Sequence, residues 1–141
     1  MRYLCIIYFS LFPFLLHAQV QDDFSDGDFI TNPTWEGDSA KFEVNAALQL
    51  HLNAPAVSDT AVIYTTNSSI DNTEWEFYVK LDFSPSASNY LKVYLVSDQP
   101  DLKKPLNGYF LRLGEDGSND AIDFFLQQGS TETLILSGID G

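Results

Sequence analysis

Four aspartates lie close together near the start of the polar part of the chain. Asp22, Asp23, Asp26 and Asp28 fall within seven residues around Gly27. Carboxylate and carbonyl oxygens are the ligands that Ca²⁺ prefers, and it takes about six to eight of them. The spacing differs from the ligand pattern of an EF-hand loop. The cluster therefore predicts either a structural Ca²⁺ site completed by residues elsewhere in the chain, or an acidic turn that binds no metal.

Exposed aromatic side chains are the second group that could bind a ligand. Tyr78, Tyr90 and Tyr94 fall on the outward faces of predicted strands, and Trp35 lies in a predicted loop. Tyrosine and tryptophan combine a flat apolar body with a polar tip, which suits them to stacking on sugar rings. These four residues predict a site for an extracellular glycan or cell-surface polymer. The alternative is that aromatic residues on neighbouring strands only pack against one another.

The residue pattern contains no signature of catalysis. His51 lies on the outward face of an alternating strand, a position typical of a surface residue. Hydrolysis of a glycosidic bond needs two carboxylates that flank the bond. Glu74 and Glu76 share one face of a predicted strand, but their setting opposite Trp75 favours a solvated outer face. The sequence therefore predicts a protein that is not an enzyme, with no catalytic residues.

A period-two alternation of apolar and polar residues indicates half-buried β-strands along most of the chain. It is clearest in Trp75–Phe83, where the odd-numbered residues would face a core and Tyr78 would face outward. In Tyr90–Val96, the odd-numbered residues lie on one face, and Tyr90, Lys92 and Tyr94 lie on the other. Shorter alternating stretches cover Leu48–Leu52, Val62–Tyr64, Tyr109–Leu113, Ile122–Leu126 and Leu134–Leu136.

Residues that favour chain reversal separate these strands. They occur in Ser25–Gly27, Asn53–Pro55, Ser84–Ser86, Pro105–Gly108, Glu115–Gly117 and Gln128–Gly129. Because no stretch has a helical period, the predicted fold class is all-β, an antiparallel β-sandwich. We expect residues 19–141 to form one truncated domain with further strands after Gly141, since a sandwich that stopped there would leave strand edges unpaired.

The N-terminal residues predict export. Arg2 precedes the apolar run Tyr3–Leu16, and the small residue Ala18 follows just before the polar part of the chain. This is the order of a secretory signal peptide, with an uncleaved N-terminal anchor as the alternative. The run is shorter than the roughly 20 apolar residues that span a bilayer. Cys5 is not at the cleavage point, where a lipoprotein carries its cysteine. We therefore expect residues 1–18 to be removed and the rest to be secreted, without insertion into the membrane.

Composition limits the partners of the exported chain. Loss of Arg2 with the signal peptide leaves six of the seven basic residues against 20 acidic ones, a net charge of −14. Such a charge repels phosphate backbones, so the sequence predicts no nucleic-acid partner. Removal of the signal peptide also removes Cys5, the one cysteine, which excludes thiol chemistry and disulfides from the remaining 123 residues.

Several short motifs along the chain resemble one bacterial family. They are Asp22–Phe29, Asn32–Trp35, Lys41–Asn45, Ile70–Phe77, Tyr94–Asp98 and Pro105–Tyr109. The family is the N-terminal module of large secreted cell-surface proteins that carry lamin-tail domains further along. The resemblance covers nearly all of residues 19–141 and implies a concanavalin A-like (laminin G-like) jelly roll. Such sandwiches often hold one structural Ca²⁺ between the N-terminal segment and a late strand.

The expected function is recognition or adhesion by a module of a larger bacterial cell-surface protein, with a glycan as its ligand. Two alternatives remain open: a structural spacer domain without a ligand, and a fragment of a secreted polysaccharide hydrolase. A recognition module predicts exposed aromatic residues that converge on one patch. A spacer predicts no such patch, and a hydrolase requires paired carboxylates in a groove.

Overall fold

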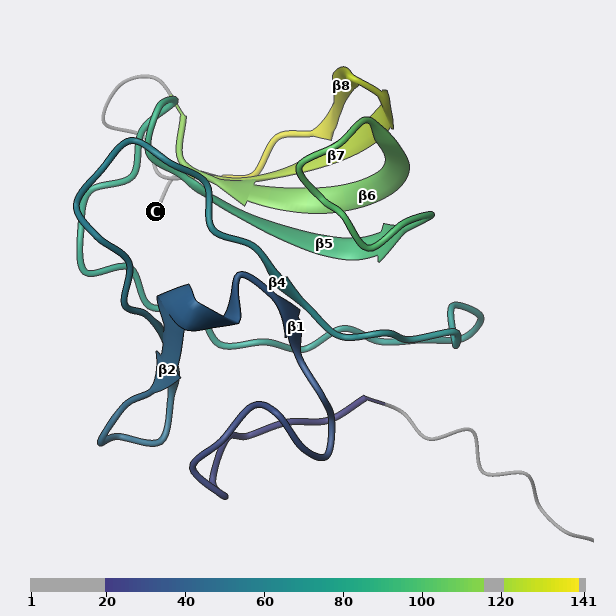
Figure 1. The fold of residues 1–141 in the computed structure, drawn as a ribbon. Coiled ribbons are helices and arrows are strands. Elements are labelled where there is room, and N and C mark those ends of the chain that lie inside the picture. The colour runs from purple at the N-terminus through teal and green to yellow at the C-terminus, as the bar shows by residue number, and fades with distance from the viewer. Residues whose placement is uncertain (1–19, 116–120, 140–141) are drawn as a thin grey trace, which may run out of the picture.

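The protein is built from antiparallel β-sheets (Figure 1), which confirms the predicted all-β class. The computed structural model describes residues 20–115 and 121–139. The predicted signal peptide, residues 1–18, lies outside the described residues. Nowhere in the described ranges does the chain form a helix that is long and apolar enough to cross a membrane.

The largest element is a four-stranded antiparallel sheet in the C-terminal half. Its strands are β5 (Leu91–Ser97), β6 (Leu106–Leu113), β7 (Ile122–Gly129) and β8 (Thr131–Leu136), and each pairs with the next along the chain. The alternating stretches of the sequence correctly predict all four positions. Gly129 ends β7 at the reversal that leads into β8. Its φ is 61°, a backbone conformation that glycine adopts without the penalty of a side chain.

Two small ladders form in the N-terminal half. β1 (Glu36–Gly37) pairs with β4 (Ile63–Tyr64), and β2 (Phe42–Val44) pairs with β3 (Leu50–Leu52). A short 3₁₀ turn, η1 (Ser39–Lys41), leads into β2. These ladders are too short to bury much apolar surface by themselves, so the four-stranded sheet supplies the core.

The N-terminal half is tied to the connection between β5 and β6. The backbone N–H of Asp38 donates to the carbonyl of Val62 over 2.7 Å, and the Asp38 carboxylate accepts the N–H of Val62 over 2.9 Å. Lys103, in the β5–β6 connection, places its Nζ 2.6 Å from the same carboxylate. This ammonium group, together with the Val62 N–H, holds the pKa of Asp38 below its usual value.

The four-stranded sheet is strongly curved. Figure 1 shows β8 turned out of the plane of β5. Lys92 on β5 and Glu132 on β8 belong to the two edge strands, yet their side chains form an ion pair. The pairing register also shifts between Tyr94 and Val96, and such irregularities bend strands and increase their twist. We call the face that carries Lys92 and Glu132 the concave face, and the opposite one the convex face.

The core lies on the concave face. Phe110 is completely buried, Leu106 is 2% exposed and Phe125 is 6% exposed. The convex face carries the apolar residues that alternate with them, but Tyr109 remains 40% exposed and Ile122 48% exposed. Curvature explains the difference, because side chains on the inside of a curved sheet converge while those on the outside spread apart.

Two of the local predictions are wrong. Trp75–Phe83 forms no strand, and its Trp75, Phe77 and Phe83 side chains are each more than 40% exposed. A strand needs a neighbour to accept its ladder hydrogen bonds, and the described residues place none beside this segment. Pro105–Gly108 is not a turn, because β6 already begins at Leu106. The chain reversal occurs just before it, in the β5–β6 connection.

Candidate functional site

The concave face brings together charged, amide and aromatic side chains from all four strands of the sheet. Their positions follow from the pairing register, which aligns residues of the same face across neighbouring strands. These polar and aromatic residues are Lys92, Tyr94, Phe110, Arg112, Asp123, Phe125, Gln127 and Glu132.

A row of three aromatic rings forms the floor of the concave face. Tyr94, Phe110 and Phe125 pair across β5, β6 and β7. The ring centroids of Tyr94 and Phe110 lie 5.0 Å apart, and those of Phe110 and Phe125 lie 5.1 Å apart with the planes nearly parallel. Centroid distances in this range are typical of favourable aromatic contacts. The row fixes the positions of the charged groups above it.

Two cations lie over this floor. The Lys92 Nζ is 4.5 Å from the centroid of the Phe110 ring, and the Arg112 Cζ is 4.5 Å from that of Phe125. Both distances fall within the range in which a ring face attracts a cation. Lys92 and Arg112 are also direct cross-strand partners, so their positive charges lie side by side.

Two carboxylates complete the charged groups. Asp123 is 4% exposed, and its Oδ1 accepts the Ser137 hydroxyl over 2.9 Å and the Gly138 N–H over 3.3 Å. Its Oδ2 lies 3.6 Å from a terminal nitrogen of Arg112, which is an ion pair beyond hydrogen-bond distance. Glu132 accepts a hydrogen bond from Lys92.

Tyr94 is a neutral hydrogen-bond donor within the face. Its hydroxyl donates to the Gln127 Oε1 over 2.5 Å, and the Gln127 amide donates to the carbonyl of Gly129 over 3.0 Å. Burial raises the pKa of Tyr94 to about 12, with further contributions from the negative charge of Glu132 and from Tyr90. The phenol therefore keeps its proton at neutral pH.

This arrangement is suited to binding. Both carboxylates of the face are paired with cations, and the cations present donors above a rigid aromatic floor. Cations held in this way can recognise the hydroxyl or acidic groups of a polar ligand.

The four aromatic residues that the sequence singled out do not form one patch. Tyr90 directly precedes β5 and lies beside Lys92, whose Nζ is 5.6 Å from its ring centroid. Tyr94 is on the same face but is half-buried, so the prediction that it is an exposed aromatic is wrong. Tyr78 lies on the unpaired segment Trp75–Phe83 and is 79% exposed.

Trp35 is held in the N-terminal loop by contacts with Asp22 and Phe24. Its indole N–H donates to the Asp22 Oδ2 over 2.8 Å, and its ring centroid lies 6.0 Å from that of Phe24. The Asp22 Oδ1 also accepts the backbone N–H of Phe24. Asp22 therefore organises this loop, which keeps Trp35 half-buried rather than free to stack on a ligand.

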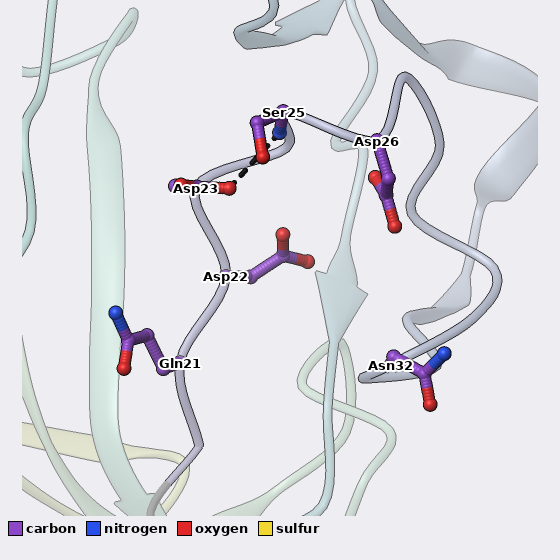
Figure 2. A pocket seen from close by; sticks show the side chains of 6 residues that line it. All are labelled: Gln21, Asp22, Asp23, Ser25, Asp26 and Asn32. Atoms are coloured by element: carbon purple, nitrogen blue, oxygen red, sulfur yellow. Dashed lines mark hydrogen bonds between the residues drawn. The ribbon is translucent and has the colours of Figure 1, made fainter.

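Three aspartates of the acidic cluster, Asp22, Asp23 and Asp26, line an open hollow together with Gln21, Ser25 and Asn32 (Figure 2). Most carboxylates of the cluster accept hydrogen bonds from backbone N–H groups. Asp23 accepts the N–H of Ser25, and Asp28 accepts those of Ile30 and Thr31. The Ser25 hydroxyl, together with the Ser25 N–H, lowers the pKa of Asp23, and the N–H groups of Ile30 and Thr31 lower the pKa of Asp28. Within the described ranges, no three acidic, histidine or cysteine side chains come together as ligands for a metal. Both alternatives, a Ca²⁺ site and an acidic turn without metal, stay predictions.

Sequence reasoning missed six residues of the concave face: Phe110, Arg112, Asp123, Phe125, Gln127 and Glu132. A signal for two of them was present, because Arg112 and Asp123 alternate with the apolar residues of Tyr109–Leu113 and Ile122–Leu126. Polar residues opposite an apolar face are normally assigned to solvent. The curvature that buries them has no such local signal.

Comparison with known proteins identifies no relative: no family model, curated protein or solved structure matches this chain. The resemblance to surface proteins with lamin-tail domains therefore stays a prediction.

Proposed function

We propose that this protein is a secreted, non-enzymatic recognition module that binds a glycan at the concave face of its four-stranded sheet. The observation that carries the proposal is the position of Tyr90. The residue is 43% exposed at the end of the face, and the Lys92 Nζ lies over its ring, so a planar apolar surface adjoins a hydrogen-bond donor. Sugar recognition needs this combination, since a pyranose has an apolar face and a rim of hydroxyl groups.

Another polar group of the face supports the same function. The Arg112 guanidinium supplies further donors and is held in place over the Phe125 ring. Rigid donors lose little conformational entropy when a ligand binds.

We further propose that the curved sheet belongs to a jelly-roll sandwich of the concanavalin A-like type. Its antiparallel order and the half-exposed apolar residues of its convex face, such as Tyr109 and Ile122, suit a layer that packs against a second sheet. The predicted signal peptide supports export, and the sequence motifs support a place at the N-terminus of a larger bacterial surface protein.

Affinity electrophoresis of the exported protein tests the glycan proposal, with a panel of soluble neutral and acidic polysaccharides cast into the gel. We expect retardation by at least one polysaccharide, loss of that retardation in Tyr90→Ala, and no change in Tyr78→Ala. The second variant is a matched control, because Tyr78 is an exposed tyrosine outside the sheet. Absence of retardation by every polysaccharide would contradict the proposal and favour a spacer domain. Equal losses in the two variants would contradict the location of the site.

A further inference from the structure

The concave face carries two neighbouring positive charges, although the chain as a whole is strongly acidic. The sequence has seven basic residues and 20 acidic ones, yet Lys92 and Arg112 are direct cross-strand partners on one face. Like charges in directly opposite positions destabilise a sheet. Two of the few cations of an acidic protein therefore share an unfavourable position, and departures of this kind concentrate at functional sites.

The acidic neighbours leave hydrogen-bonding capacity on both cations. Asp123 directs its hydrogen bonds to Ser137 and Gly138, and its 3.6 Å contact with Arg112 is too long for a hydrogen bond. The Arg112 Nε is buried and has no hydrogen-bond partner in the described part of the chain. Such a buried, unsatisfied donor is costly and is uncommon in folded proteins.

Lys92 uses only part of its hydrogen-bonding capacity within the face. Glu132 accepts one hydrogen bond from its ammonium group, which has three N–H donors. The side chains of Lys92 and Arg112 are 20% and 24% exposed, so both can be reached from solvent.

We propose that the ligand of the concave face is an acidic glycan, and that its ring carboxylate binds between Lys92 and Arg112. This inference rests on the proposed glycan-binding function. Cross-strand partners have Cβ atoms about 5 Å apart, which allows one carboxylate to bridge the two cations. Arginine suits this role because its planar fork donates two parallel hydrogen bonds to a carboxylate.

Tyr90 favours a uronic acid over an acidic peptide as the ligand. The residue is 43% exposed, and the Lys92 Nζ lies over its ring, 5.6 Å from the ring centroid. A uronate can therefore stack its ring on Tyr90 while its carboxylate reaches the cations. The ligand carboxylate then competes with Glu132 for Lys92, so removal of the Glu132 charge strengthens binding.

The test measures binding of oligogalacturonate and of the same oligomer with its carboxyl groups chemically reduced to alcohols. We expect calorimetry to show at least about tenfold tighter binding of the acidic form, since hydrogen bonds to charged groups are the stronger ones. Arg112→Gln should lose most of this preference, whereas Lys104→Gln should keep it. Lys104 is a matched control, because it carries the same charge on an exposed side chain of the β5–β6 connection. Glu132→Gln should bind the acidic oligomer more tightly.

The outcomes separate the two proposals. Binding of both oligomers with equal affinity overturns the acidic-glycan assignment and leaves the glycan-binding function intact. If neither of them nor any neutral polysaccharide binds, the proposed function itself is overturned. Equal effects of Arg112→Gln and Lys104→Gln overturn the role of Arg112 and indicate a general effect of net charge. A far-UV circular dichroism spectrum verifies that each variant is folded, and Lys92→Gln provides an independent test should Arg112→Gln not fold.

Discussion

Two adjacent phenylalanines of β7 test which face of the sheet is the core. Phe125 points to the concave face, where it is 6% exposed and stacks on Phe110. Phe124 points to the convex face, where it is half-buried and stacks on Tyr109, which is itself 40% exposed. The two residues have the same side chain and are adjacent in the sequence. Replacing each by alanine therefore removes the same ring from two different environments, and any difference in cost reports on burial.

The expected cost of Phe125→Ala is about 4 kcal/mol of unfolding free energy. Replacement of a buried phenylalanine by alanine costs roughly 3–5 kcal/mol, which includes the cavity left behind. The stack on Phe110 contributes about 0.5–1.5 kcal/mol of this, and the Arg112 side chain over the ring contributes further. Phe124→Ala should cost about 2 kcal/mol, because a half-buried ring loses roughly half of what a fully buried one loses.

Urea unfolding followed by circular dichroism measures both values in the exported protein. A difference of about 2 kcal/mol corresponds to roughly 8 °C in melting temperature for a chain of this size. Since Phe125→Ala removes a large part of a typical stability of about 5–15 kcal/mol, the milder pair Phe125→Leu and Phe124→Leu should be compared as well, with the same order expected. A larger loss from the Phe124 substitutions would refute the concave core and point to the convex face.

Three further predictions concern single residues. The pKa of Tyr94 is raised to about 12 in the folded state, so the unfolded chain ionises first and stability falls as pH rises from about 10 to 12. Tyr94→Phe should reduce this fall in urea midpoints, and an unchanged pH profile would argue against a buried phenol. Gly108→Ala should cost roughly 1–3 kcal/mol or prevent folding, because a Cβ there would lie 2.3 Å from a backbone carbonyl oxygen of β5; a neutral urea midpoint would be inconsistent with this close approach. If the acidic loop binds Ca²⁺, millimolar Ca²⁺ should raise the melting temperature and Asp26→Ala should abolish the rise, whereas melting that chelators leave unchanged would count against a metal.

The sequence determined where the strands of the four-stranded sheet lie and which of their residues share a face. Alternation has a period of two because successive side chains of a strand point to opposite sides, so it can be read from neighbouring residues alone. Lys92 and Tyr94 were correctly separated from Leu91 and Val93 in this way. The same local pattern was not sufficient for Trp75–Phe83, because a strand also requires a hydrogen-bonding neighbour, and that neighbour comes from elsewhere in the chain.

Only the tertiary structure decided which face is buried and which charges meet. The sheet's curvature turns the mixed polar face inward, so that Asp123 and Gln127 are buried while the apolar convex face stays half-exposed. It also brings Lys92 and Glu132 together from opposite edges, a contact between residues 40 positions apart. Curvature arises from the twist and register shifts of all four strands acting together. No single segment encodes that property, and for this reason the site became visible only in the folded chain.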